Sequence, residues 1–370
     1  MTIEQQKLID DEIDTELGER YYGGRQEVEE ALIDDIIKIT SAFIDRRFRE
    51  GRRPALRDAH AKDTGCVRAF FHIDQDLDQS LRHGVFVPGR EYSAWIRFSN
   101  GNSERLGDRW PDARGMAIKL MGVPGPKFLD DETMTQDFIL ANNPAFFVDN
   151  LQMYRDTLER FHSGGLPRQY ISALRLGWRE RYLAVKVNFG WITNPLFCQY
   201  WSMTPYRLGA AQGPRCAIKF MAKPCLPQSP GLLSRLATII TPQFSLKSEM
   251  ASTLISRDMS FDFYIQKYVD SRTPIEDSTV KWEERIAVPQ RVAKIIIPSQ
   301  DLMSSYLDQF CENLTFNPWH CLPHHKPLGA VNRVRRRVYL GISERRHQLN
   351  RVAMQEPIQD AAIRTPQNVQ

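Results

Sequence analysis

The sequence predicts an α+β protein in which mostly antiparallel strands form one barrel or sandwich with helices packed around it. Three observations indicate this class. Apolar residues recur at helical spacing near both ends of the 370-residue chain. Short apolar runs separated by Gly, Asn, Asp and Pro fill the middle, and no regular strand–helix–strand alternation occurs. No linker-like stretch divides the strand-rich region, so we expect a single core.

The elements are expected in the following order. Residues 1–50 form an N-terminal helical segment, because Ile36, Ile39 and Phe43 continue an apolar stripe at helical spacing. Residues 51–349 form the main domain, and 350–370 are a polar C-terminal tail. Strands are predicted at 67–73, 93–98, 116–121, 138–141, 183–187, 216–221, 259–266 and 293–297. Further helices are predicted at 148–162, 167–181, 301–313 and 330–349.

Composition excludes several classes of protein. Hydrophobic residues make up 42% and charged residues 25%, which excludes disorder, collagen and coiled coil as the main architecture. No apolar run approaches 18 residues and the N-terminus is acidic, so neither a transmembrane segment nor a signal peptide is expected. The six cysteines form no CxxC pair, which indicates free thiols in a reducing compartment and a cytoplasmic location. The net charge of +4 is too small by itself to indicate a nucleic-acid partner.

The Arg-rich run at 333–337 is the first candidate for a functional site. Arg335 and Tyr339 are i,i+4 neighbours on a helix, and Arg346 lies two turns beyond on the same stripe. The simplest interpretation is a solvated basic helix or a patch that contacts phosphates. The sharper one is that the guanidinium stabilises a phenolate, which is a good ligand for ferric iron.

Four further clusters are unremarkable when each is taken alone. A single His, an Arg at a strand end or two amides before Pro are most often structural. In the second cluster, strand alternation places Arg97 and Ser99 on one face and Phe98 on the other. The clusters are Arg-Asp-Ala-His-Ala-Lys at 57–62, Trp-Ile-Arg-Phe-Ser-Asn at 95–100, Asp-Ala-Arg-Gly at 112–115 and Ala-Asn-Asn-Pro-Ala-Phe-Phe at 141–147.

In their order and spacing, the five clusters resemble the heme catalase family. The similar segments are RxxH with the following Ala-Lys (57–62), Ile-Arg-Phe-Ser (96–99), 111–119, Asn-Asn-Pro-Ala-Phe-Phe (142–147), 259–266 and Arg335-x-x-x-Tyr339. The resemblance covers roughly residues 50–349. It implies a catalase-like antiparallel β-barrel core with surrounding helices, and heme b with ferric iron as the cofactor.

The resemblance also implies roles on the distal side of the heme. His60 would be the acid/base that moves the peroxide proton, and Ser99 would hold the other ring nitrogen of His60. An amide would hydrogen-bond the peroxide. Asn142 is the first choice for it and Asn143 the alternative, because one residue is missing between the Asn pair and Pro144.

The remaining implied residues bind the heme itself. Tyr339 would be the proximal iron ligand, and Arg335 would keep it ionised. The other heme contacts would be Arg57, Arg97 and Arg346 for the carboxylates and Tyr154 stacked on the porphyrin.

Several positions depart from the family pattern. Asp63 and Arg68 replace glycines, and Val338 stands where a small residue is usual. About 31 residues follow Tyr339. Neither the reduced-nicotinamide site of the family nor its interlocked tetramer is therefore expected, although a homo-oligomer is possible. The architecture resembles that of minimal, core-only catalase-related heme proteins.

The function expected is that of a heme peroxidase or catalase-like oxidoreductase, which acts on hydrogen peroxide or organic hydroperoxides with an unidentified reductant. Such an enzyme would serve the response to oxidative stress. The alternatives are a true catalase, an allene oxide synthase-like enzyme that rearranges fatty-acid hydroperoxides, and a non-catalytic heme-binding sensor. Nucleic-acid binding by 333–337 is disfavoured, because these arginines fall in the heme motif.

Overall fold

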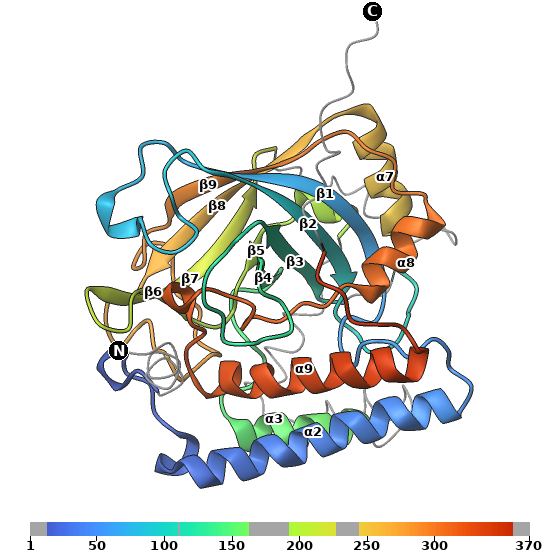
Figure 1. Ribbon diagram of the computed structural model, residues 1–370, viewed down its shortest axis with the longest axis horizontal. Helices are drawn as coiled ribbons and strands as arrows, with labels where there is room; N and C mark the ends of the chain where they lie inside the picture. Colours follow the sequence, from blue (N-terminus) through green and yellow to red (C-terminus); the bar gives the residue numbers. More distant parts are fainter. Residues whose placement is uncertain (1–12, 110–111, 163–191, 227–243, 358–370) are drawn as a thin grey trace, which may run out of the picture.

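A closed antiparallel barrel forms the centre of the computed structural model, which describes residues 13–109, 112–162, 192–226 and 244–357 (Figure 1). Neighbouring strands follow the order β5-β4-β3-β2-β1-β9-β8-β7, and the β5–β7 pairing closes the ring of eight. β6 (Tyr206–Gly209) adds to the outer edge of β7. The barrel strands are β1 Asp63–Ile73, β2 Glu91–Asn100, β3 Arg114–Met121, β4 Thr135–Ala141, β5 Tyr200–Trp201, β7 Arg215–Pro224, β8 Met259–Lys267 and β9 Gln290–Ile297.

Aromatic side chains fill the barrel. Phe263 on β8 is fully buried, and its ring centroid lies 5.0 Å from that of Phe71 and 5.1 Å from that of Phe138. On β2, Ile96 and Phe98 belong to the same core cluster. Because successive side chains of a strand point to opposite faces, the residues between these core positions face outward.

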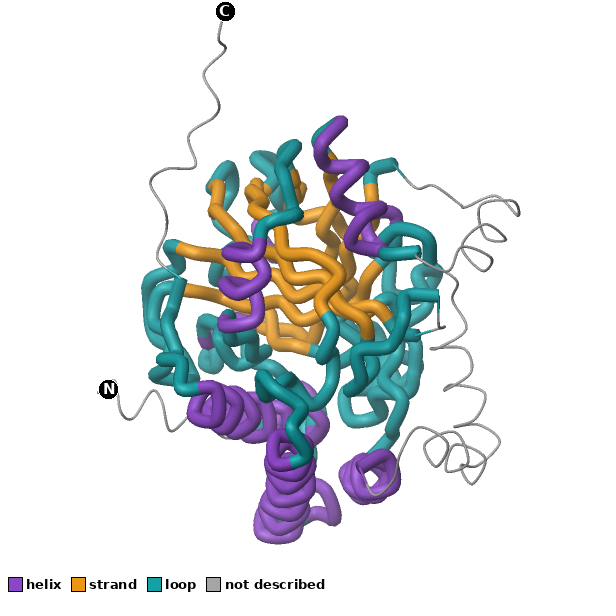
Figure 2. The backbone as a smooth tube through the Cα atoms, turned by 90° about the vertical axis from the view of Figure 1, so that its right-hand side faces the viewer, coloured by secondary structure: helices purple, strands orange, loops and turns teal. Residues whose placement is uncertain are grey.

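Three helices form a layer on one side of the barrel (Figures 1 and 2). α2 (Gln26–Arg49) lies along α9 (Ala330–Asn350) and α3 (Leu151–His162). They share a second apolar cluster, to which Ile36 and Val334 contribute fully buried side chains. Burial of this shared face, rather than helix propensity, is what stabilises such helices.

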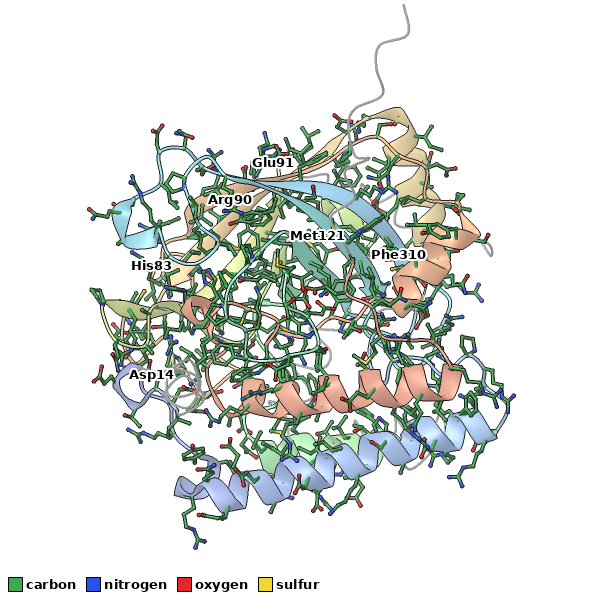
Figure 3. The ribbon with its side chains drawn as sticks, in the orientation of Figure 1. Asp14, His83, Arg90, Glu91, Met121 and Phe310 are labelled. Atoms are coloured by element: carbon green, nitrogen blue, oxygen red, sulfur yellow. The ribbon has the colours of Figure 1, made fainter. Side chains whose placement is uncertain are left out.

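Two shorter helices cover another part of the barrel. α7 (Leu246–Ser256) and α8 (Ser305–Asn313) both contact β1. Phe310 of α8 packs on the outer face of β2, where its ring centroid lies 4.6 Å from that of Trp95 (Figure 3). The C-terminal end of α8 is thereby brought close to the outward-facing residues of β1 and β2.

The predicted α+β class and antiparallel barrel are confirmed. Seven of the predicted strands match β1–β4 and β7–β9, and the helices predicted at 148–162, 301–313 and 330–349 match α3, α8 and α9. β5, β6 and α7 were not predicted. The predicted helix at 167–181 and strand at 183–187 lie outside the described residues. The division into 1–50, 51–349 and 350–370 stays a prediction.

Membrane insertion through a helix finds no support in the part of the chain that the structure describes. None of the helices there combines the length and the apolarity needed to span a bilayer.

Replacing Phe263 by Ala tests the barrel core. The substitution Phe263→Ala should lower the free energy of unfolding by about 3–5 kcal/mol, because a fully buried ring leaves a cavity among three other phenylalanine rings. Urea denaturation followed by tryptophan fluorescence measures this. The control Val288→Ala, at a side chain that is 65% exposed, should change the same quantity by less than about 0.5 kcal/mol.

Candidate functional site

His60 lies in the loop between α2 and β1, and its backbone is held in an uncommon conformation. Its φ angle is 59°, in the left-handed region that residues other than glycine rarely adopt. Two contacts hold it there. The His60 amide donates to the carbonyl of Gly101 at 3.2 Å, and the His60 carbonyl accepts a hydrogen bond from Arg97 Nη2 at 2.9 Å. Such conformations cluster at functional sites, which draws attention to this residue.

The imidazole of His60 rests on the outer face of β2 and β3. Its Nδ1 lies 3.0 Å from Ser99 Oγ, and Ser99 pairs with Gly115 on the neighbouring strand. A Cβ atom on Gly115 would lie 2.7 Å from both His60 Nδ1 and Ser99 Oγ. The absence of a side chain at Gly115 therefore makes room for the ring. Arg97 and Ser99 lie on this outer face while Phe98 points into the core, as the alternation predicted.

The environment keeps His60 neutral. The pKa of His60 is lowered to about 4. Burial is the main cause, the positive charge of Arg97 is the next, and the charges of Arg335 and Arg57 lower the pKa further. At neutral pH the ring can therefore accept a proton. Since Nδ1 faces Ser99, Nε2 is the atom available to a substrate.

Arg57 and Arg346 both contact one carboxylate at the end of α8, that of Glu312. Arg57 Nη1 lies 3.0 Å from Glu312 Oε1, and Arg346 Nη1 lies 3.2 Å from the same oxygen. Arg57 also donates to three main-chain carbonyls between residues 311 and 314. The buried Nε atoms of Arg97 and Arg346 have no hydrogen-bond partner among the described residues. Arg105 Nη2 lies 3.8 Å from the other oxygen of the Glu312 carboxylate, so several guanidinium groups share one carboxylate and the cluster carries an excess of positive charge.

The ionisation of the cluster reflects the same excess. Burial and the neighbouring Arg57 lower the pKa of Arg346 to about 9. Burial would raise the pKa of Glu312, but Arg57, Arg97 and Arg346 together hold it below its usual range. Repulsion between buried cations is relieved by an anion, and the guanidinium fork pairs well with carboxylates. The cluster is therefore suited to a ligand that carries carboxylates.

Arg335 and Tyr339 lie one turn apart on α9, as predicted. Arg335 Nη2 donates to Tyr339 Oη at 3.3 Å, and Nη1 donates to Thr204 Oγ1 and Asn332 Oδ1, both at 3.1 Å. Arg335 is 1% exposed, whereas Tyr339 is half-buried. Burial alone would lower the pKa of Arg335, but Tyr339 raises it, so the guanidinium remains charged beside the phenol. Its charge also contributes to the lowered pKa of His60.

The rest of the Arg-rich run does not form an open basic patch. Arg333 pairs with Glu29 of α2 at 2.6 Å and with Glu19 at 2.7 Å. Arg337 pairs with Asp34 of α2 at 2.6 Å. These ion pairs hold α9 against the N-terminal segment.

The two amides of the 141–147 segment differ in their contacts. Asn142 Oδ1 accepts a hydrogen bond from the amide of Arg114 at 2.7 Å, and its Nδ2 makes none that the described residues show. The Nδ2 of Asn143 donates one of its two hydrogens to the carbonyl of Ala145. These contacts favour Asn142 as the amide that donates to a ligand.

Tyr154 lies on α3 in the apolar cluster shared with α2 and α9. It is 8% exposed, and its ring packs edge-on against Phe146 at 5.8 Å and Phe147 at 6.1 Å between centroids. Burial raises the pKa of Tyr154, with a further contribution from Tyr339, so its hydroxyl remains protonated at neutral pH. Tyr154 is thus near the α9 pair, and its stacking on a porphyrin stays a prediction.

One group of side chains has the composition of a metal site but is filled by a lysine. Glu132, Asp137 and His320 offer ligand atoms within 4.8 Å of one another. The ammonium of Lys119 lies among them, 2.8 Å from Asp137 Oδ1 and paired with Glu132. Burial would lower the pKa of His320, but Asp131 and Asp137 raise it to about 9, so the ring is a second cation. This network is therefore a buried ion cluster that ties β3 and β4 to the segment before α9.

Three participants were missed by the sequence analysis as site residues. Glu312 joins the arginines, Thr204 supports Arg335, and Gly115 makes room for His60. Gly115 lies within 111–119, a segment that is similar to catalases, so the resemblance could have indicated it as a site residue. Nothing in the sequence near Glu312 or Thr204 distinguishes them, because their roles arise from contacts with distant segments.

Comparisons with known proteins identify the fold. Neither a family model nor a curated protein matches the sequence. Among solved structures, a fungal catalase matches with a TM-score of 0.63 and 17% identity over 82% of this chain, and a bacterial catalase with 0.63 and 15% over 87%. Catalase A from Saccharomyces cerevisiae matches with 0.62 and 18% over 83%. The chain spans 62%, 65% and 66% of these three catalases, respectively. The protein therefore has a catalase-like fold.

The residues present fit a heme. The excess of positive charge around Arg57, Arg97 and Arg346 suits the carboxylates of a heme, and two buried Nε atoms there lack partners among the described residues. The Tyr339 hydroxyl, beside a charged guanidinium, is a donor that suits ferric iron.

The substitution Gly115→Ala tests the close approach of β3 to His60. The added methyl group would meet the imidazole and Ser99 Oγ, so the free energy of unfolding should fall by about 1–3 kcal/mol. Gly341→Ala on α9 is the matched control. Its Cβ would have only one neighbour, at 3.9 Å, and a helical alanine should leave stability unchanged or raise it by up to about 1 kcal/mol. Equal losses in the two variants, measured by urea denaturation, would contradict this role of Gly115.

Proposed function

We propose that the protein is a heme-dependent oxidoreductase that reduces hydrogen peroxide or organic hydroperoxides at the expense of a reductant. The observation that carries the proposal is the neutral His60, fixed over Gly115 beside the arginine cluster and the Arg335–Tyr339 pair. Together, a base, an anion-binding cluster and a phenol next to a permanent cation could hold a heme and move the proton of a peroxide.

Residues on both sides of the site would hold the cofactor. Tyr339 would ligate the iron, with Arg335 stabilising its phenolate. Arg57, Arg97 and Arg346 would pair with the two carboxylates. When bound, heme supplies the ferric iron that binds the peroxide and holds the oxidising equivalents after O–O cleavage.

The chain itself moves the proton. His60 Nε2 takes the proton from the peroxide oxygen nearest it and returns it to the departing oxygen, so that water or an alcohol leaves. Ser99 fixes the ring by holding Nδ1 at 3.0 Å. Asn142 Nδ2 donates to the peroxide, because Asn142 Oδ1 is anchored on the backbone of Arg114. A base already oriented and uncharged needs no rearrangement before it reacts.

A reductant-dependent reaction is favoured over dismutation by one feature of the structure. A surface cavity borders Arg57, which also contacts Glu312 in the arginine cluster, so an organic molecule would have room next to the proposed heme site. A true catalase remains the second candidate on the strength of the catalase-like fold. The two differ in one measurement: rapid oxygen release from hydrogen peroxide without any reductant indicates dismutation.

Replacing Tyr339 by Phe tests the iron ligand. The substitution Tyr339→Phe should weaken heme binding by more than about 10-fold and abolish the ferric-tyrosinate absorption, because the phenolate oxygen is removed. Heme titration followed by ultraviolet–visible spectroscopy measures both. The matched control is Tyr306→Phe, at a tyrosine that is 75% exposed on α8, and it should bind heme as the wild type does. A wild-type spectrum in Tyr339→Phe would rule out this ligand.

Replacing His60 by Gln tests the acid/base. Peroxide-dependent dye oxidation by the heme-loaded protein should fall by about 10²–10⁴ in kcat/KM, the usual contribution of a positioned proton-transfer group. Its heme spectrum should remain, since His60 is not the ligand proposed. His72→Gln, on the half-exposed side of β1, should keep full activity. The mechanism fails if His60→Gln is as active as His72→Gln.

A further inference from the structure

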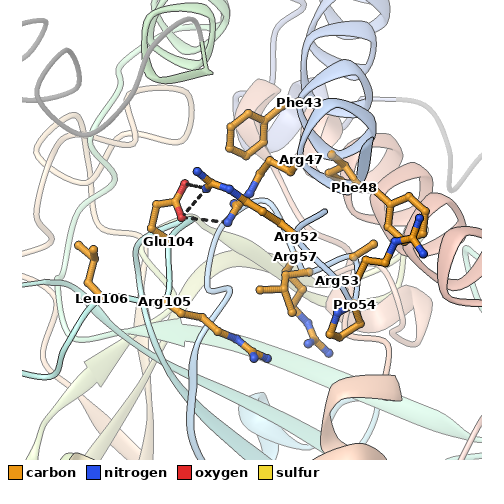
Figure 4. Close-up of a pocket in the computed structure, with 13 residues that line it drawn as sticks. Phe43, Arg47, Phe48, Arg52, Arg53, Pro54, Arg57, Glu104, Arg105 and Leu106 are labelled. Carbon is orange, nitrogen blue, oxygen red and sulfur yellow. Dashed lines mark hydrogen bonds and ion pairs between the residues drawn. The ribbon is translucent and has the colours of Figure 1, made fainter. Parts of the chain in front are cut away.

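A separate cavity opens beside the arginine cluster. It lies between the C-terminal end of α2, the loop from α2 to β1 and the loop between β2 and β3, and its volume is about 280 Å³ (Figure 4). Of the residues that form the proposed heme site, only Arg57 borders it among the described residues. Its lining consists of Phe43, Ile44, Arg47, Phe48, Arg52, Arg53, Pro54, Ala55, Leu56, Arg57, Glu104, Arg105 and Leu106.

The lining is strongly positive. Five of the lining residues are arginines and one is a glutamate. Arg47 Nη2 lies 3.0 Å from Glu104 Oε2, and Arg52 Nη1 lies 2.7 Å from Glu104 Oε1, so this carboxylate is shared by two guanidinium groups (Figure 4). Glu104 therefore leaves the other arginines of the cavity without a close counter-charge from this wall.

Two of these arginines are placed to receive an anion. The Arg53 guanidinium lies 4.6 Å from the centroid of the Phe48 ring and has no ion pair with the described residues. Arg105 approaches Glu312 only at 3.8 Å, which is longer than a hydrogen bond, and its side chain is 48% exposed. Both can offer a guanidinium fork to a carboxylate from solvent.

The cavity also has an apolar wall. Phe43 and Ile44 from α2 are buried, and Leu56 and Leu106 close the wall from the two loops. A small inorganic anion would leave this surface in contact with water. The combination of an apolar wall and a basic rim fits a carboxylate attached to an apolar body.

The position of the cavity connects it to the chemistry. Arg57 borders the cavity, contacts Glu312 in the arginine cluster and precedes His60 by three residues. We propose that this cavity binds a carboxylate-bearing aromatic reductant, the second substrate of the peroxide reaction. The identity of this ligand as a reductant rests on the proposed function, whereas its binding does not.

The reaction balances with a phenolic acid as the reductant. One hydroperoxide takes up two electrons and two protons, which breaks the O–O bond and gives an alcohol and water. Two phenolic acid molecules each lose one electron and one proton from the phenol and become phenoxyl radicals. The carboxylate is unchanged, so it serves only for recognition.

The experiment compares p-coumarate with its methyl ester, which has the same phenol but no negative charge. Isothermal titration calorimetry on the full chain should show p-coumarate binding at least tenfold more tightly than the ester. Arg53→Glu and Arg105→Gln should each weaken p-coumarate binding at least fivefold and leave the ester unaffected. Inorganic phosphate at equal concentration should compete poorly.

Arg49→Glu is the matched control, because Arg49 is an exposed arginine at the end of α2 that does not line the cavity. It makes the same change of charge as Arg53→Glu and should retain wild-type affinity. Equal affinity for acid and ester, or equal loss in Arg49→Glu, would overturn the site. Circular dichroism establishes whether each variant is folded. If Arg53→Glu does not fold, the binding data of Arg105→Gln decide whether the site exists.

Steady-state oxidation by the heme-loaded protein separates the two proposals. The KM for p-coumarate should rise at least fivefold in Arg105→Gln, while kcat and the oxidation of the methyl ester stay constant. If p-coumarate binds as expected but neither phenol is oxidised, the proposed function fails and the binding site stands. If both phenols are oxidised with equal KM and calorimetry detects no preference for the acid, the cavity proposal fails and the proposed function stands.

Discussion

The closed barrel imposes the constraint on which the rest of the molecule depends. Its interior is filled by aromatic and aliphatic side chains, so one face of each strand is committed to the core. Polar side chains on the same strands must therefore face outward, where Arg97 and Ser99 lie beside Gly115. α8 covers part of the outer face of β2, and α2, α3 and α9 form a layer on one side of the barrel. The candidate site is thus built on the outside of the barrel, between strands and helices.

Burying a charge at this boundary raises the free energy of the folded state unless the charge has a partner. Two clusters of buried charges in the molecule differ in how their charges are paired. Around Lys119, the cations and carboxylates are brought into direct contact, and Asp137 accepts both the ammonium and His320. Around Arg57 and Arg346, a single carboxylate serves several guanidinium groups, and two buried Nε atoms lack partners in the described residues. The first cluster is complete as a structural element. The second has an excess of positive charge that an anionic ligand would balance, which is the physical basis of the proposal that a heme binds there.

Elements with a strong local signal were predicted, and those without one were not. β2 and β3 carry long apolar alternation, and α9 has a clear helical stripe. β5 has only two residues, so it shows no periodicity of its own, yet it closes the barrel through its pairing with β7. In the site, the resemblance to catalases supplied the predicted residues. It left Asn142 and Asn143 open, and their hydrogen bonds favour Asn142, which stays a prediction.

The sequence by itself determined the features that depend on neighbours along the chain. Strand alternation separated Arg97 from Phe98, and the i,i+4 spacing paired Arg335 with Tyr339. Only the tertiary structure decided what depends on segments that are far apart. The approach of Gly115 to His60, the convergence of arginines on Glu312 and the cavity between α2 and two loops all join such segments. Local patterns specify the direction of a side chain, whereas its partner across the fold is fixed only when the barrel closes and the helices pack on it.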